Sequence, residues 1–132
     1  MARLFTPGQA KPLGLPGRNS LEIVSRETGA KGVTLRRVEI PVAQPDDPPR
    51  APHQHHDTEE CIHVLSGRGI TAADSGEYVL APGSTLLVPP GEKHVTRNTG
   101  NEPLVLLCFF PVADVARTTV EPRVSKRTPK RS

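Results

Sequence analysis

Apolar residues in this chain occur in short runs separated by turns, and no run sustains the period of about 3.6 residues expected of an amphipathic helix. Fifteen prolines and eleven glycines punctuate the sequence. The predicted strands are residues 21–25, 32–42, two strands within 61–73 that meet around Gly67, then 77–80, 84–88, 94–98 and 104–110. This pattern predicts an all-β fold, an antiparallel sandwich or barrel.

The length of 132 residues favours a single hydrophobic core. We expect a Pro/Gly-rich N-terminal arm over residues 1–20, a β domain over residues 21–113 and a C-terminal extension over residues 114–132. Residues 43–52 (AQPDDPPRAP) are rich in proline and charge, so they are predicted to form a surface loop. The apolar strand 104–110 (LVLLCFF) is expected to be exposed and to need cover.

The net charge of +3 is concentrated at the C-terminal end. Residues 123–132 contain five basic side chains and no acidic one, so the rest of the chain carries 12 basic against 14 acidic residues. We expect this basic tail to be disordered. Nucleic-acid binding is not favoured, because the chain has only four aromatic residues on which bases could stack.

The cysteines, the N-terminal residues and the length of the apolar segments indicate in which compartment the protein is expected. Cys61 and Cys108 both lie in apolar, strand-like runs, which fits two reduced thiols better than a disulfide. The first twenty residues show no signal-peptide pattern, and no apolar segment is long enough to span a membrane. The sequence therefore predicts a cytoplasmic protein with no membrane partner.

The candidate chemistry lies in residues 52–67 (PHQHHDTEECIHVLSG). His53 and His55 are two positions apart, so they project from the same face of a strand. Glu60 shares a face with apolar residues of the next strand, and an inward carboxylate costs several kcal/mol unless it meets a cation or hydrogen bonds. His94 follows the Pro-Pro-Gly turn of a later strand and could supply a third imidazole. This donor set suits Fe, Mn, Zn, Ni, Co or Cu better than Ca or Mg.

The same residues resemble the two motifs of the cupin superfamily. His53-x-His55, Glu60 and Gly67 match the first motif, and the second resembles Gly83, Pro89-x-Gly91, His94 and Asn98. One departure is Asp47, where the first motif often opens with glycine. The resemblance covers roughly residues 34–111 and implies a compact, single-domain, jelly-roll barrel, or double-stranded β-helix. It also implies one divalent transition metal ion per chain, held by His53, His55, Glu60 and His94, and a homodimer formed through sheet faces.

Other polar residues near these motifs have simpler interpretations. His56 is expected to face solvent, His63 to pack outside the barrel, and Glu59 to point away from the interior. Thr96 and Asn98 share the face of His94, so they could support the ligands, although Asn98 could equally close a turn. One of Arg36 and Arg37 must face inward, where it could meet an anionic substrate or form an ordinary salt bridge.

The leading functional hypothesis is a metal-dependent enzyme that acts on a small oxygenated organic molecule chelated at the metal. The resemblance implies dioxygenase chemistry first, with isomerase, decarboxylase or lyase, and cyclase chemistry as further candidates. Glu60 is the candidate catalytic residue, as a base. Two alternatives remain open: a non-catalytic module that binds or senses a small ligand, and a barrel in which the metal is only structural.

Overall fold

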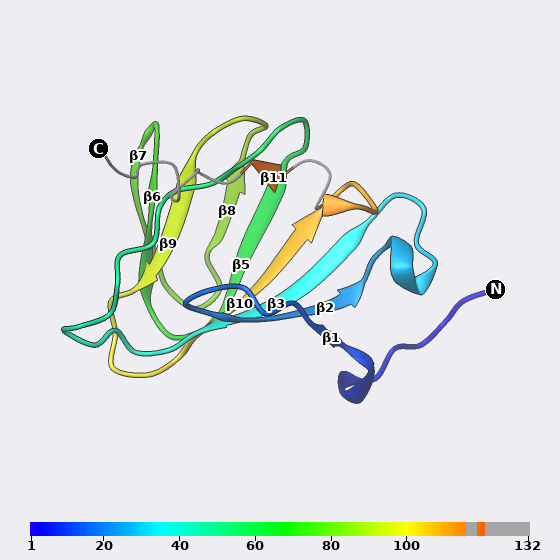
Figure 1. Cartoon of the computed structure of the whole chain (residues 1–132), viewed down its shortest axis with the longest axis horizontal. Helices are drawn as coiled ribbons and strands as arrows, with labels where there is room; N and C mark the ends of the chain where they lie inside the picture. Colours follow the sequence, from blue (N-terminus) through cyan, green and yellow to red (C-terminus); the bar gives the residue numbers. More distant parts are fainter. Residues whose placement is uncertain (116–118, 121–132) are drawn as a thin grey trace, which may run out of the picture.

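A computed structural model describes residues 1–115 and 119–120 of the chain, and Figure 1 shows their arrangement. The strands are β1 (Lys11–Pro12), β2 (Asn19–Val24), β3 (Thr34–Ile40), β4 (Gln54–His55), β5 (Glu60–Ser66), β6 (Gly69–Ala73), β7 (Gly76–Leu80), β8 (Thr85–Val88), β9 (His94–Asn98), β10 (Leu104–Phe110) and β11 (Thr119–Val120). Two short 3-10 turns are η1 (Pro7–Gln9) and η2 (Arg26–Thr28). The all-β prediction is confirmed.

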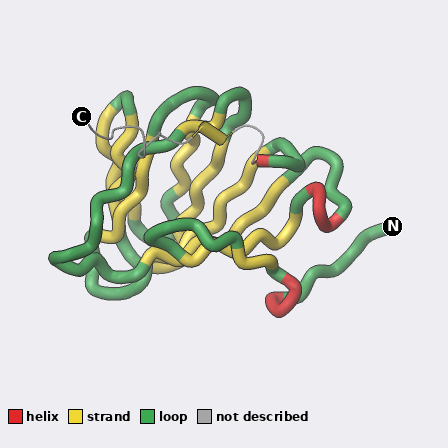
Figure 2. The backbone as a smooth tube through the Cα atoms, in the orientation of Figure 1, coloured by secondary structure: helices red, strands yellow, loops and turns green. Residues whose placement is uncertain are grey.

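The strands form two main sheets that face each other as the two walls of a jelly roll. The larger sheet has six strands in the order β1-β2-β3-β10-β5-β8, and the smaller one has three in the order β7-β6-β9. The strand pairs are antiparallel. Figures 1 and 2 show the small sheet standing across one end of the large one, with the two helical turns at the opposite end. The strands β4 and β11 pair with each other over two residues and close one side of the barrel.

The inner face of the large sheet follows the period-2 alternation of its strands. In β5, Glu60, Ile62 and Val64 are buried, while the residues between them are only partly covered. The same alternation buries Val38 and Ile40 in β3. The buried apolar cluster is made of Val38, Ile40, Ile62, Val64, Leu80, Val88, Leu104, Leu106, Cys108, Phe110 and Val115. Glu60 therefore enters the interior from the same face as the core.

The apolar run 104–110 has a different place from the one predicted. It was expected to be exposed, but as β10 it lies inside the large sheet, paired with β3 on one side and β5 on the other. Five of its seven residues are buried, and the two flanking strands pair with its backbone on both sides. Only Leu107 and Phe109 of this strand are not buried, so it is not the exposed apolar strand that the sequence predicted.

The N-terminal arm forms part of the domain wall in this structure. Lys11–Pro12 pairs with β2 as an edge strand, a position where proline is tolerated because it need not donate to a neighbour. The loop between β1 and β2 carries Leu13, Leu15 and Arg18 to the interior. The predicted basic tail, residues 123–132, lies outside the described residues. Within the described residues, no helix is long and apolar enough to cross a membrane.

Candidate metal centre

Two segments far apart in the sequence bring three histidines together. His53 and His94 form an isolated antiparallel bridge, in which the His53 amide donates to the His94 carbonyl at 3.0 Å and the His94 amide donates to the His53 carbonyl at 2.8 Å. The amide of Gly91 donates to the His55 carbonyl at 2.8 Å. The Pro-Pro-Gly turn is therefore fastened to the strand that carries the first two histidines. The ring centroids of His53 and His94 are 4.4 Å apart.

Glu60, the first residue of β5, faces these rings from the large sheet. Its Oε1 lies 3.0 Å from Nε2 of His94 and 3.2 Å from Nε2 of His55. Each of the four residues offers one donor atom, and these atoms all lie within 4.8 Å of one another. The structure thus gathers the four residues that the sequence motifs single out.

The tautomer of His94 follows from the hydrogen bond at its Nδ1 atom. Nδ1 of His94 lies 3.0 Å from the carbonyl oxygen of Glu92, and a carbonyl only accepts, so Nδ1 carries a proton. In the neutral ring, Nε2 then holds the lone pair and points at the cluster. A ligand histidine is commonly oriented in this way by a hydrogen bond from its second nitrogen.

The electrostatics of the cluster favour a cation between its members. Burial alone would raise the pKa of Glu60, but hydrogen bonds and charges from His55 and His94 outweigh it and lower this pKa to about 2. Burial and the neighbouring His94 lower the pKa of His53 to about 3. Burial would also lower the pKa of His94, yet Glu60 raises it overall. A carboxylate that faces two imidazole nitrogens requires a proton or a metal ion in the space they share.

The donor atoms fit a transition metal ion in type and in spacing. Metal-to-nitrogen and metal-to-oxygen distances of about 2.1 Å place donors on opposite sides of an ion about 4.2 Å apart, and adjacent donors about 3 Å apart. The separations of 3.0 and 3.2 Å at Glu60, and the limit of 4.8 Å for the whole set, lie close to these values. Three imidazoles and a carboxylate form a set that Fe, Mn, Ni, Co, Cu or Zn accepts.

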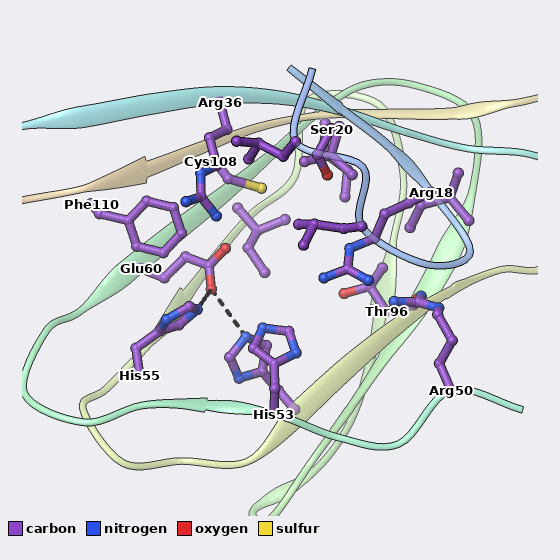
Figure 3. A pocket seen from close by; sticks show the side chains of 17 residues that line it. Arg18, Ser20, Arg36, Arg50, His53, His55, Glu60, Thr96, Cys108 and Phe110 are labelled. Atoms are coloured by element: carbon purple, nitrogen blue, oxygen red, sulfur yellow. Dashed lines mark hydrogen bonds and ion pairs between the residues drawn. The ribbon is translucent and has the colours of Figure 1, made fainter. Parts of the chain in front are cut away.

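The cluster lies in the wall of a cavity of about 360 Å³ between the two sheets, shown in Figure 3. Small-molecule sites in proteins begin at about this volume, roughly 300 Å³. The cavity is lined by Leu13, Leu15, Arg18, Ser20, Arg36, Val38, Ile40, Arg50, His53, His55, Glu60, Ile62, His94, Thr96, Leu106, Cys108 and Phe110. Its wall therefore combines eight apolar residues with nine charged or polar ones.

His56, Glu59 and His63, which the sequence did not predict to be metal ligands, lie away from this cavity. His56 and Glu59 are exposed. His63 points to the outer face, where its Nδ1 is 2.8 Å from the hydroxyl of Thr85. These positions agree with the alternation of side chains along β5 and with the turn that precedes it.

The supporting residues near the second motif have structural partners. The hydroxyl of Thr96 lies 2.6 Å from that of Thr71 on the neighbouring strand β6. The amide of Asn98 bonds the carbonyl oxygens of Ile40 and Glu102, so this side chain closes the turn between β9 and β10. Neither contact involves a histidine of the cluster.

One of the paired arginines, Arg36, faces the interior, and both arginines form ordinary salt bridges. Arg36 faces the cavity, and its Nε lies 3.1 Å from Oε1 of Glu22. Its guanidinium also lies over the ring of Phe110, 5.5 Å from the centroid. Arg37 points outward, with its Nη1 3.6 Å from Glu39.

Sequence reasoning missed three polar residues of the cavity wall, namely Arg18, Ser20 and Arg50. All three come from the segment predicted to be an arm or from the proline-rich loop. No local pattern marks Arg18 and Arg50, because their loops have no strand alternation that tells inward from outward positions, and Ser20 lies just before the predicted strand 21–25. Only the contact of these segments with the barrel brings the three residues to the cavity.

Comparisons with known proteins identify relatives of this fold. The profile of the Cupin domain family matches residues 37–110. An uncharacterized protein of Methanocaldococcus jannaschii is 38% identical over 56 residues, which cover 42% of this chain and 45% of that protein. A glucose-6-phosphate isomerase of Thermococcus kodakarensis is 34% identical over 64 residues, 45% of this chain and 34% of the isomerase. The matches thus span less than half the length of these curated relatives.

Solved structures show the same architecture at low sequence identity. Pac13, a nucleoside dehydratase from Streptomyces, aligns with a TM-score of 0.75 and 12% identity over 93% of this chain and 92% of that one. The oxalate decarboxylase of Lactobacillus farciminis aligns with a TM-score of 0.73 and 19% identity over 86% of this chain and 34% of that one. At these identities the likeness extends to the fold alone.

Proposed function

Because this chain belongs to the cupin family, we propose that it is a metal-dependent enzyme acting on a small oxygenated organic molecule that chelates the metal. The ligands are His53, His55, Glu60 and His94, and one divalent transition metal ion binds per chain. The reaction is of the dioxygenase, isomerase, decarboxylase or lyase, or cyclase type. Relatives that include an isomerase and a dehydratase support testing non-oxidative chemistry beside dioxygenase chemistry.

The observation that carries this proposal is the position of the four donors at the wall of the cavity. Glu60 and His94 are 5% and 2% exposed, so solvent reaches them through the cavity if at all. A charged carboxylate this deeply buried costs several kcal/mol unless a cation compensates it. A ligand that enters the cavity meets the donor cluster directly.

In the proposed enzyme, the side chains around the cavity have different roles. A bound metal ion would supply Lewis-acid or redox chemistry. The apolar walls, with Ile62, Leu106 and Phe110, exclude water and so strengthen the polar interactions inside. Glu60 is the candidate base, since its second carboxylate oxygen can take up a proton while the first remains with the histidines.

A non-catalytic ligand-binding module is the second candidate, and one observation favours it. Among the described residues that line the cavity, Glu60 is the sole carboxylate, and it also belongs to the donor cluster. The thiol of Cys108 is no substitute base at neutral pH, because burial raises its pKa well above 9.0. A binding module needs no separate proton carrier.

The first experiment is elemental analysis of protein purified without a metal-affinity column. The wild type should contain a stoichiometric transition metal. His53→Ala should lose it while the strands stay folded by circular dichroism. His56→Ala is the matched control, because it removes an exposed imidazole only three residues away, and it should retain the metal. Equal loss in both variants, or no metal in the wild type under any loading condition, would refute the site.

The second experiment separates the two candidate functions. Metal-loaded protein is incubated with diketones, hydroxy acids, sugar phosphates and phenolics, with and without oxygen, and products are followed by mass spectrometry. Oxygen uptake that depends on the added compound indicates a dioxygenase, whereas an isomer or an elimination product under nitrogen indicates an isomerase or lyase. Binding without any turnover across the panel would favour the binding module.

We also propose a cytoplasmic homodimer that forms through the outer face of the large sheet. Phe109 on β10 pairs with Cys61 on β5, and Cys61 pairs with Leu87 on β8, so the three lie in one row. Phe109 and Leu87 are 39% and 57% exposed, and burial of such side chains favours association. Analytical ultracentrifugation at micromolar concentration should show a dimer that Phe109→Ser weakens. A monomeric wild type would contradict it.

A further inference from the structure

The peptide unit between Glu92 and Lys93 is hydrogen-bonded at both ends. Its carbonyl oxygen, which belongs to Glu92, accepts from Nδ1 of His94 at 3.0 Å. Its N–H group, which belongs to Lys93, donates to Oδ2 of Asp74 at 3.0 Å. Because a trans peptide bond is planar, its C=O and N–H groups point in opposite directions, so one rigid unit connects the two side chains. We call this series, from the Asp74 carboxylate to the His94 imidazole, the hydrogen-bond relay.

The position of Asp74 beside this peptide unit follows from the register of the small sheet. The strands β6, β7 and β9 lie side by side in Figure 1, and Ala73 at the end of β6 pairs with His94 at the start of β9. The turn that follows Ala73 therefore lies beside the residues that precede His94. The amide of Asp74 also donates to the carbonyl oxygen of Lys93 at 3.1 Å. Asp74 thus holds Lys93 through its backbone and through its side chain.

The neighbouring residues hold the same segment from two sides. The amide of Ser75 donates to Oε2 of Glu92 at 3.0 Å, and the hydroxyl of Ser75 donates to the same oxygen. On the other side, the amide of Gly91 donates to the carbonyl oxygen of His55 at 2.8 Å. Residues 91–93 are therefore fixed between the β6–β7 turn and the strand of the first two histidines. The direction of the Glu92 carbonyl is set by these contacts together with its bond to His94.

A carboxylate at one end of the relay affects the imidazole at the other. Hydrogen bonds in series polarise one another, so the bond from Lys93 to Asp74 makes the Glu92 carbonyl oxygen a stronger acceptor. A stronger acceptor at Nδ1 of His94 fixes the ring and makes its Nε2 a better donor to a metal ion. Asp74 is exposed, so solvent weakens this effect relative to a carboxylate in direct contact with the ring.

We propose that Asp74 is a positioning residue of the metal centre, which acts through the peptide unit between Glu92 and Lys93 to orient His94 and to strengthen its Nε2 as a ligand. This inference rests on the proposed function, because His94 must bind the metal. Asp74 lies between the two sequence motifs, in a turn to which neither motif assigns a role.

The test measures how fast Co²⁺ leaves the loaded protein in excess EDTA, followed by the visible absorption bands of the bound ion. Partners in direct contact with a ligand change metal affinity by about 10- to 100-fold, so Asp74→Ala, which acts through one peptide unit, should release Co²⁺ about 3- to 30-fold faster. Asp74→Asn should lie between the wild type and Asp74→Ala, because its amide oxygen still accepts from Lys93 but carries no charge. The Co²⁺ bands should shift in the same order.

Two control variants separate the relay from simpler effects. Ser75→Ala removes the hydroxyl contact of the same turn but keeps the backbone bond to Glu92 and leaves the relay intact. Glu77→Gln removes a negative charge from the same hairpin, where Glu77 lies 3.6 Å from Arg97. Both should release Co²⁺ within about twofold of the wild-type rate, with unshifted bands.

Three outcomes would overturn the inference while the metal centre stands. The first is an unchanged release rate in Asp74→Ala. The second is a wild-type rate and spectrum in Asp74→Asn, which would mean that the hydrogen bond has only a structural role. The third is an equal acceleration in Glu77→Gln, which would indicate a general effect of charge.

Failure of the proposed function gives a different result, because the wild type would then take up no metal. The relay is still measurable in that case, by NMR of the metal-free protein. The Nδ1 proton of His94, assigned as the imidazole signal that is lost in His94→Gln, should move upfield in Asp74→Asn and further in Asp74→Ala. That order would support the positioning of His94 by Asp74, and an unmoved signal would refute it.

Discussion

Replacing Asn98 with alanine should destabilise the protein without affecting metal binding. Nδ2 of this 4% exposed side chain donates to the carbonyl oxygens of Ile40 at 3.0 Å and Glu102 at 2.8 Å, and its Oδ1 accepts from the amide of Gly100 at 2.8 Å. The first bond crosses from β9 to the end of β3, and the other two close the turn before β10. Asn98 thus joins the small sheet to the large one.

The magnitude follows from these three contacts. A neutral hydrogen bond contributes about 1 kcal/mol, and a buried group left without a partner costs about 1–3 kcal/mol. The carbonyl of Ile40 is deep enough to incur part of that cost, so we expect Asn98→Ala to lower the free energy of unfolding by about 3–4 kcal/mol. Against a total of about 5–15 kcal/mol for a typical domain, this is a large fraction.

Urea denaturation followed by circular dichroism measures the effect. The midpoint should fall by more than about 1 M with an unchanged m-value, for a typical m of about 1–3 kcal/mol per molar urea. Asn101→Ala is the matched control, because it changes the same residue type at an exposed position of the same turn. A loss at Asn98 no greater than at Asn101 would refute the reasoning. Loss of metal at unchanged stability would instead show that Asn98 supports the ligands.

Three further predictions follow from other contacts. Gly67→Ala should unfold more readily than Gly83→Ala in thermal melts, by about 1–3 kcal/mol, because both glycines have positive φ but a Cβ at Gly67 would lie 2.4 Å from a carbonyl oxygen while Gly83 faces open space. Equal melting temperatures would contradict the steric argument. Thr71→Val should cost about 1–3 kcal/mol, and adding Thr96→Val should cost less than the sum of the two single changes, as judged by a double-mutant cycle. Metal retained after dialysis against a chelator should fall as the pH is lowered through neutrality, since Glu60 raises the pKa of His94 and protons then compete with the metal. Constant retention through neutrality would count against His94 as a ligand.

The strand pattern and the position of the donor residues could be predicted from the sequence. Alternation of side chains along a strand is a local property, so Glu60 could be assigned to the same face as Ile62 and Val64 without knowledge of the partner strands. The spacing of His53 and His55 is local in the same sense. Metal binding itself stays a prediction.

The location of β10 could not be predicted in this way. Its run of apolar residues is compatible with an exposed edge strand that needs a partner and with a central strand that already has two. Local sequence does not distinguish these cases, because strand order depends on pairing between segments far apart in the chain. Here Phe110 pairs with Thr34, and Leu106 pairs with Val64.

By itself, then, the sequence determined the all-β class, most strands and the four residues that converge at the candidate metal centre, since these depend on local alternation and motif spacing. Tertiary structure alone decided which polar groups face that centre across the cavity. Arg18 and Arg50 lie in loops without regular alternation and Ser20 lies near the start of β2, so their orientation depends on how these segments pack against the barrel. Long-range packing also made Asn98 a link between sheets, because its partner Ile40 is 58 residues away in the chain.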